Sequence, residues 1–256
     1  MGLLPSTPDV EVYAPTTWFV GQNAVIEVDV ICKEATKVDF IDVRGTGQQG
    51  WEVGAGESRT TQRASYPQLA ARVMTGGVLP AGKTRYGARF LLPPGTAPSH
   101  QLAPAWAHFE IFVHVAIPWW IDGKYRFHVP VRVPPPPRVE RTPIAMRSTA
   151  ADAPAGKPRL ELSLASTRLI AGETLVGSCA VFHVDDRKER ELDITLVPVI
   201  RLHGARVRER RATTYNIGIT LPPGSAGTNI PFQFRLPERM TPSFKSITHE
   251  VKWYLV

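Results

Sequence analysis

The chain has few cysteines and no long apolar run. Its only two cysteines, Cys32 and Cys179, stand one in each half. Two isolated cysteines form neither a disulfide framework nor a clustered metal site. Cys32 continues the apolar alternation of Val28 and Val30, which predicts a buried free thiol. A protein with free thiols suits a reducing compartment. No apolar stretch reaches the roughly 20 residues of a membrane-spanning helix, and no signal peptide is visible. We therefore expect a cytoplasmic protein.

The sequence also lacks the motifs of an enzyme. It has no Gly-x-Ser-x-Gly elbow, and the dinucleotide-like string Gly45–Gly50 stands among strand signals with no following helix, which predicts a loop. His108 and His114 share a predicted strand face, but six residues separate them by roughly 20 Å, too far to share a metal ion. We expect no catalytic residue, no cofactor and no metal.

Helical periodicity is missing too, whereas strand signals are abundant. The chain holds 24 prolines and 20 glycines, which a mostly helical protein would not tolerate. Apolar residues alternate with polar ones over Ala24–Cys32 and again over Phe109–Val115, as in half-buried strands. Asp122-Gly123, between two β-forming runs, predicts a hairpin with a type I′ turn. The predicted class is all-β.

Motifs recur in the same order in both halves of the chain. Each half contains a Gly-polar pair that opens a strand, a Leu-Pro-x-Gly turn, and a Phe-x-Leu-Pro segment closed by Pro-Ser. The matched positions are Gly21 with Gly172, Leu79–Gly82 with Leu221–Gly224, Phe90 with Phe234, Leu92-Pro93 with Leu236-Pro237, and Pro98-Ser99 with Pro242-Ser243. We infer two tandem copies of one immunoglobulin-like β-sandwich rather than one large fold.

The predicted boundaries follow from the repeat. The first sandwich spans 8–134, a Pro/Ala/Arg-rich linker spans 135–157, and the second sandwich spans 158–256. The final run Val251–Val256 matches Phe109–Val113, after which the first copy continues for about twenty residues. We expect the second sandwich to lack its last strand, or the chain to have been cut short, and an unpaired edge would favour association.

The repeated motif order resembles the arrestin superfamily over about Val10–Val133 and Arg159–Val256. The two-copy bacterial sporulation-control proteins and the α-arrestins look nearest. The resemblance implies two arrestin-type sandwiches and a non-enzymatic adaptor or scaffold. It does not extend to the phosphate-sensing residues of receptor arrestins, nor to a Pro-Pro-x-Tyr motif, since Pro134–Pro137 is followed by Arg138.

Two sets of residues are candidate contact sites. Arg206, Arg208, Arg210 and Arg211 form the densest basic cluster, and alternating arginines on one strand face can hold phosphates or carboxylates, although they can equally keep a hairpin soluble. Trp119 and Trp120 are adjacent, so they face opposite sides of a strand, and one exposed indole would be an interaction anchor.

We expect a cytoplasmic adaptor that binds protein partners through sheet faces, sheet edges or the basic hairpin. The formal net charge of +7 leaves a second reading open, a stress or sporulation regulator on the periphery of an anionic membrane, and it also suits a phosphorylated ligand. A third reading is a structural subunit that forms homo-oligomers through its open edge. A nucleic-acid partner is not expected.

Overall fold

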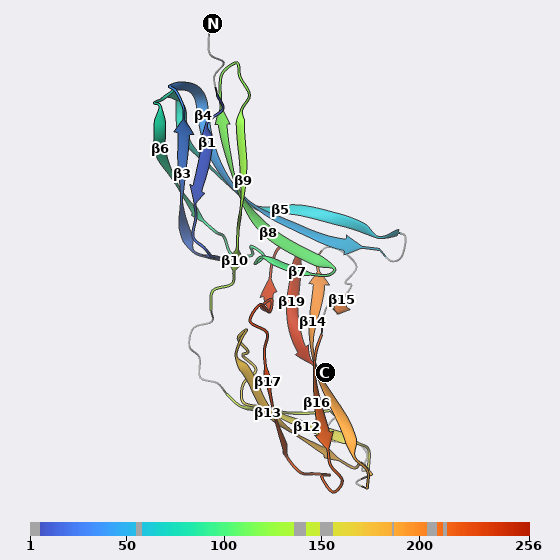
Figure 1. The fold of residues 1–256 in the computed structure, drawn as a ribbon. Helices are drawn as coiled ribbons and strands as arrows, with labels where there is room; N and C mark the ends of the chain where they lie inside the picture. The colour runs from blue at the N-terminus through green and yellow to red at the C-terminus, as the bar shows by residue number, and fades with distance from the viewer. Residues whose placement is uncertain are drawn as a thin grey trace. The chain divides into compact units, whose positions relative to one another are not determined.

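Every regular element of the described chain is a β-strand. The structure is a computed structural model that describes residues 6–54, 58–135, 142–148, 156–185, 187–203, 209–211 and 214–256. The predicted all-β class is therefore confirmed, and each half of the described chain contains two packed sheets (Figure 1).

The chain divides into two compact units. The first unit comprises Met1–Pro134, Ile200–Arg210 and Phe244–Glu250. The second comprises Pro135–Val199, Arg211–Ser243 and Val251–Val256. Two segments of the second sequence copy thus pack with the first unit, and the boundaries inferred from the repeat stay a prediction.

The first unit is a two-layer sandwich. One sheet has the order β1 (Asp9–Tyr13), β3 (Asn23–Cys32) and β6 (Gly82–Leu91). The other has the order β5 (Thr60–Leu79), β4 (Thr36–Val53), β8 (Ala105–Ala116) and β7 (His100–Leu102), with β9 (Gly123–Val129) also pairing with β8. A parallel pair, β2 (Trp18–Phe19) with β10 (Val131–Arg132), lies beside them. Ile26 and Val28 of β3 and Ile111 and Val113 of β8 are fully buried in one core.

The second half of the chain forms two further sheets, of which the parts within Ile200–Arg210 and Phe244–Glu250 belong to the first unit. One sheet has the order β11 (Ile144–Arg147), β12 (Arg159–Leu164), β13 (Thr174–Phe182) and β17 (Ile230–Arg235). The other contains β14 (Arg190–Leu202), β15 (Glu209–Arg211), β16 (Tyr215–Leu221), β18 (Phe244–Lys245) and β19 (His249–Leu255). Leu175 and Cys179 of β13 pack with Ile194 of β14 and Phe232 of β17. Strand β11 lies within the predicted linker and pairs with β12.

The internal repeat extends to backbone register. Asn23 and Ala24 pair with Leu91 and Phe90, and in the second unit Thr174 and Leu175 pair with Arg235 and Phe234. These are the positions that the sequence repeat aligns. Both predicted cysteine positions are buried free thiols, and burial raises the pKa of each.

The strand junctions repeat as well. The amide of Leu92 donates to the carbonyl of Gln22 at 3.1 Å, and the amide of Leu236 donates to the carbonyl of Glu173 at 2.8 Å. Gly21 and Gly172 precede these acceptors with φ of 82° and 81°, values that a residue with a side chain adopts only with strain. Both junctions therefore use a glycine where the chain turns into a strand.

The loop predicted at Gly45–Gly50 is wrong, because these residues lie within β4. Gly45 and Gly50 face aromatic rings of β8, and a Cβ atom on Gly45 would stand only 2.9 Å from the Phe109 ring. The Trp106 indole occupies the corresponding space over Gly50. The glycines therefore leave room for aromatic neighbours instead of making turns.

The predicted turn at Asp122-Gly123 is also wrong. The chain reverses at Ile117–Trp120, where the Trp120 amide donates to the Ile117 carbonyl at 3.2 Å, and Gly123 already begins β9. The Asp122 carboxylate instead accepts the Ile117 amide at 3.2 Å and contacts His114 Nε2 at 2.8 Å. The Asp122 side chain therefore closes a longer loop, and no tight turn forms at Asp122-Gly123.

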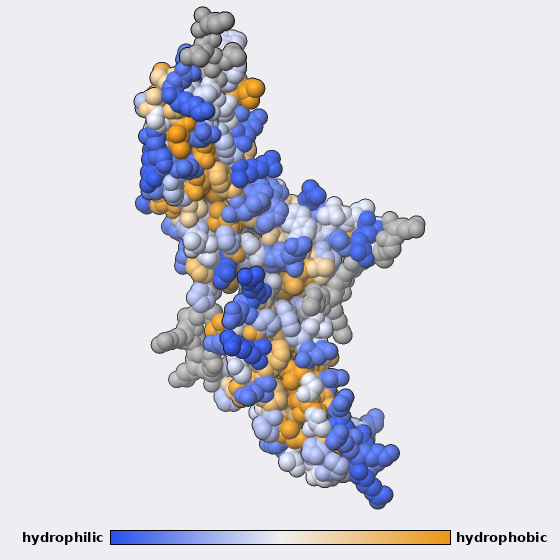
Figure 2. Space-filling model, in the orientation of Figure 1, coloured by the Kyte–Doolittle hydropathy of each residue, from blue (hydrophilic) through white to orange (hydrophobic). Residues whose placement is uncertain are grey.

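Asp29 anchors a band of charged side chains on the β1–β3–β6 sheet. Its carboxylate is fully buried and accepts hydrogen bonds from Arg85 Nε and an Arg85 terminal nitrogen at 2.6 and 2.8 Å, while Lys83 lies at 3.3 Å. Figure 2 shows hydrophilic residues along the edge of the molecule where β6 lies, with apolar residues beside them. Arg85 and Lys83 lower the pKa of Asp29 to about 2, with the Arg85 hydrogen bonds as the main cause.

Alanine substitutions at the Leu-Pro junction of the first unit should distinguish the stability contribution of a buried leucine from that of its exposed neighbour. Leu92→Ala removes a fully buried side chain, so we expect unfolding free energy to fall by about 2–5 kcal/mol. The neighbouring Leu91 is 51% exposed, so Leu91→Ala should change stability by less than about 1 kcal/mol. Urea denaturation measures both, and equal losses would contradict the assignment of Leu92 to the core.

The Asp29 band predicts an acid dependence of stability. Because its pKa in the folded protein lies below the usual carboxyl value of 3.8, the stabilisation is complete above about pH 4 and is lost as the pH falls toward 2. Asp29→Asn should flatten this part of the stability profile, since asparagine does not titrate. Asp39→Asn, at an exposed aspartate, is the control. Parallel profiles for wild type and Asp29→Asn would contradict the prediction.

Candidate functional site

The predicted basic cluster falls largely outside the described residues. Arg206 and Arg208 are not among them, and Arg210 and Arg211 belong to β15, for which only the backbone is described. A row of arginines on one face therefore stays a prediction.

The two predicted tryptophans have different environments. Trp119 stands at the turn between β8 and β9 with φ of 62° and is 102% exposed. Trp120 is partly buried and packs against the core of the first unit. Ile121, which follows them, is 72% exposed. The structure thus leaves one indole free for contact and uses the other for packing.

A larger candidate site lies on the solvent side of the β5–β4–β8–β9 sheet, which we call the outer face. Residues of β8 alternate, so that Phe109, Ile111 and Val113 enter the core while the residues between them point away from it. The outer face includes Phe40, Asp42 and Arg44 of β4, Arg72 of β5, Trp106, His108, Glu110, Phe112 and His114 of β8, and Lys124, Arg126 and His128 of β9.

Aromatic rings are ordered against one another across this face. Trp106 and His108 stack with 5.0 Å between ring centroids and an angle of 10°. Phe40 meets His114 edge-on at 5.1 Å, and Phe112 lies 6.2 Å from the same imidazole. The rings are thus already held in place before any partner arrives.

Arginines cover part of this aromatic surface. Arg72 lies over the Phe40 ring at 4.3 Å, and Arg126 lies over Phe112, its cross-strand partner, at 5.9 Å. Cation–π contacts of this kind contribute about 0.5–1 kcal/mol at exposed positions and fix the orientation of the guanidinium. The arginines retain donors that can bind a partner.

Each carboxylate of the outer face already has a basic neighbour. Asp42 accepts from Arg72 Nε at 2.7 Å and from Arg44 at 3.2 Å, and these guanidinium groups, Arg72 first, hold the pKa of Asp42 below its usual value. Glu110 lies 3.5 Å from His108 and 3.8 Å from His128. The carboxylates therefore do not stand free to hold a cation.

Asp122 orders the loop beside the outer face. Its hydrogen bonds with His114 and with the Ile117 amide hold the pKa of this carboxyl below its usual value, with the His114 contact as the larger cause. The carboxylate stays ionised and ties the Trp119 turn to the end of β8. The two candidate regions, Trp119 and the outer face, are therefore joined through His114.

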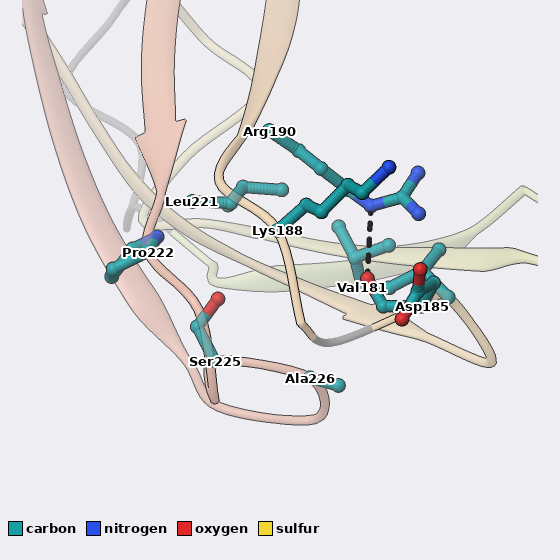
Figure 3. A pocket seen from close by; sticks show the side chains of 9 residues that line it. Val181, Asp185, Lys188, Arg190, Leu221, Pro222, Ser225 and Ala226 are labelled. Atoms are coloured by element: carbon teal, nitrogen blue, oxygen red, sulfur yellow. Dashed lines mark hydrogen bonds between the residues drawn. The ribbon is translucent and has the colours of Figure 1, made fainter.

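The second unit has a small pocket between its two sheets (Figure 3). It is lined by Val181, Val184, Asp185, Lys188, Arg190, Leu221, Pro222, Ser225 and Ala226. Arg190 Nε donates to the Asp185 carbonyl at 3.1 Å, which ties the start of β14 to the turn after β13. The space holds little more than one water molecule, so the pocket does not fit an organic substrate.

No group of three or more metal-ligating side chains was found among the described residues. The described part of the chain likewise contains no helix that could span a membrane.

Sequence reasoning missed the outer face, although one signal for it was present. The alternation in β8 separates Phe109 and Ile111 from His108 and Glu110, but it places Phe112 on the polar side. A phenylalanine on the solvent side of an alternating strand is a sign of a contact surface. Its partners Arg126 and Phe40 come from other strands, and their proximity depends on register that the sequence does not show.

Comparisons with known proteins give no family assignment. No family model and no curated protein matches the chain. Among solved structures, the chain is similar to the crystal structure of Spo0M, a sporulation control protein from Bacillus subtilis, with 15% sequence identity and a TM-score of 0.41 over 69% of this chain and 80% of that chain. So low a TM-score carries no argument, and the two-sandwich description rests on the sheets themselves.

The two tryptophans predict opposite results in a stability experiment. Trp119→Ser should change the free energy of unfolding by less than about 0.5 kcal/mol, since the indole is fully exposed. Trp120→Ser should cost about 2–4 kcal/mol, because its indole packs against the core. Thermal or urea unfolding of the two variants checks this, and a large loss in Trp119→Ser would exclude it as a free contact residue.

Proposed function

We propose that this protein is a non-enzymatic adaptor whose first unit binds a protein partner through the outer face. The observation that carries the proposal is the array of ordered aromatic and arginine side chains on the solvent side of β8 and β9. The fold-level resemblance to arrestins, noted from the sequence motifs, is consistent with an adaptor but is weaker support, because one fold serves many functions.

The composition of the outer face suits a protein surface. Protein interfaces are enriched in aromatic residues and arginine, and such residues supply most of the binding energy at hot spots. Stacked rings such as Trp106 and His108 lose little rotamer freedom on binding, since they are already packed. Phe112 and Arg126 are paired across β8 and β9, with the guanidinium over the ring, and both belong to this surface.

The charge of the outer face favours a protein over a purely anionic ligand. The cations Arg44, Arg72, Lys124 and Arg126 share this face with the carboxylates Asp42 and Glu110, and Asp122 lies in the adjoining loop. Arg44 and Arg72 are already bound to Asp42. A membrane-binding surface would carry a clearer excess of positive charge.

The proposal places the protein in the cytoplasm, where its partner would meet an open sheet face. Peripheral attachment to an anionic membrane and self-association are the competing functions, and the basic cluster at Arg206–Arg211 is the competing contact site. Each has its own outcome in the experiment below.

The test is capture of partners from the native host with the full chain as bait, followed by affinity measurement with the recovered partner. The double variant Phe112→Ser with Arg126→Ser removes a cross-strand pair from the outer face. Its matched control is Val25→Ser with Arg89→Ser, an exposed cross-strand pair on the opposite sheet. We expect the first variant to weaken binding at least tenfold, roughly 1.4 kcal/mol, and the control to bind like wild type.

Three results would overturn the proposal. A partner that binds both variants equally excludes the outer face, and its loss on replacing Arg206, Arg208, Arg210 and Arg211 by serine would move the site to the basic cluster. Salt-sensitive binding to vesicles containing phosphatidylserine, with no protein recovered, would favour the membrane function. Recovery of the chain itself, with a concentration-dependent dimer in sedimentation, would favour the structural subunit.

A further inference from the structure

A chain of buried polar side chains holds the segment Phe244–Glu250 within the first unit. Ser246, Thr248 and His249 of this segment are buried, and His249 is fully so. They meet Gln49 of β4 and His100 of β7. Buried polar groups are normally all hydrogen-bonded, so each contact in this chain requires a proton.

The chain runs between two backbone carbonyls. Its consecutive contacts are Tyr66 O to Gln49 Nε2 at 3.2 Å, Gln49 Oε1 to Thr248 Oγ1, Thr248 Oγ1 to His249 Nδ1 at 2.8 Å, His249 Nε2 to His100 Nε2 at 3.1 Å, and His100 Nδ1 to Pro98 O at 2.8 Å. All five contacts lie within the first unit.

A count of protons shows that the neutral chain is one short. Both ends are carbonyl oxygens, which only accept. Each of the four side chains between them, when neutral, supplies one proton along the chain: one from the amide, one from the hydroxyl and one from each imidazole. Four protons cannot fill five contacts. Exchanging an imidazole tautomer or flipping the Gln49 amide moves the empty contact but does not remove it.

The orientation set by the two ends leaves the empty contact beside His249. Gln49 Nε2 donates to Tyr66 O, so Thr248 donates to Gln49 Oε1. At the other end His100 Nδ1 donates to Pro98 O. With its proton on Nδ1, His249 donates to Thr248, and the two Nε2 atoms face each other at 3.1 Å with a lone pair on each; with its proton on Nε2, His249 donates to His100, and its contact with Thr248 is empty.

A fifth proton would fill every contact but would bury a positive charge. The groups facing the pair are the Phe244 ring, Gln49, the Pro98 carbonyl and a third imidazole, His203 of the segment that follows β14, and the ionisable groups found to shift the pKa of His249 are His100 and His203. Burial is the largest cause that lowers the pKa of His249, to about 3, and burial also lowers the pKa of His100. No described carboxylate contributes to either shift.

We propose that the His100–His249 pair is an acid-sensitive clasp, which holds Phe244–Glu250 on β4 and β7 while both imidazoles are neutral and releases it when they take up protons. Neither protonation state is fully satisfied in the closed form: the neutral pair has an empty contact, and the charged pair lacks a counter-ion. In the open form water solvates both imidazoles and both accept protons near their usual pKa.

The sign of the pH dependence follows from these lowered values. The closed form binds fewer protons than the open form, so the clasp is firm above about pH 6.5 and weakens as the pH falls toward 4. With two imidazoles becoming charged on opening, the opening constant should rise by up to about a hundredfold per pH unit in this range.

Hydrogen exchange of backbone amides measures this opening in the full chain. The reporters are the Ser246 amide, which donates to His249 O at 2.8 Å, and the His203 amide, which donates to Thr248 O at 2.8 Å. After correction for intrinsic exchange, their protection should fall between pH 7 and pH 4. Amides in the β3–β6 ladder should keep theirs. Equal protection of the reporters at pH 7 and pH 4 would overturn the proposal.

Variant His100→Gln tests the pair itself. Its amide can donate to His249 Nε2 without a charge, so the clasp should be no weaker than wild type at pH 7, and its opening constant should rise by at most about tenfold per pH unit. His128→Gln, at an exposed histidine of the outer face, should retain the wild-type slope. A wild-type slope in His100→Gln would overturn the proposal.

A second measurement covers the case in which His100→Gln does not fold. Side-chain ¹⁵N spectra of the wild-type protein report the charge and tautomer of each imidazole. We expect both His100 and His249 to be neutral at pH 6, each with its proton on Nδ1 or exchanging with the alternative tautomers. A charged imidazole at either position at this pH would overturn the proposal.

Discussion

Each sandwich depends on the junction between the start of one strand and the end of its neighbour. The two strands are β3 and β6 in the first unit and β13 and β17 in the second. A glycine with positive φ turns the chain, the next residue offers its carbonyl, and a buried leucine donates its amide to that carbonyl before a proline ends the strand. In the first unit these are Gly21, Gln22 and Leu92. The same geometry recurs in the second unit, where it joins β13 and β17. One local arrangement therefore sets the register of the β1–β3–β6 sheet and of the sheet that contains β13 and β17.

Register in the first sheet determines what the second sheet can expose. Once β3 and β6 bury their alternate residues, β8 must turn Phe109, Ile111 and Val113 toward them to complete the core. The intervening residues then face solvent as a group. The outer face is therefore a consequence of core packing, while its aromatic content is not, because solubility alone would have favoured small polar residues there.

The sequence was sufficient to predict the all-β class, the repeat and the Leu-Pro junctions, because each depends on local pattern or on spacing along the chain. It was not sufficient for Gly45 and Gly50, where ring atoms from a distant strand decide the conformation. The prediction of a turn at Asp122-Gly123 was wrong for a similar reason. The Asp122 carboxylate accepts the amide of Ile117, five residues earlier, and closes a longer loop instead. The outer face and the histidine pair required three or more segments to be brought together.

The grouping of Phe244–Glu250 with the first unit has a consequence for how the chain tolerates substitution. A sandwich formed by one continuous stretch of chain would tolerate a change there without regard to residues far away in the sequence. Here Gln49 is buried against Thr248, so a change at either position alters the packing and the hydrogen bonding of the other. Substitutions at these two positions should therefore be found as compensating pairs.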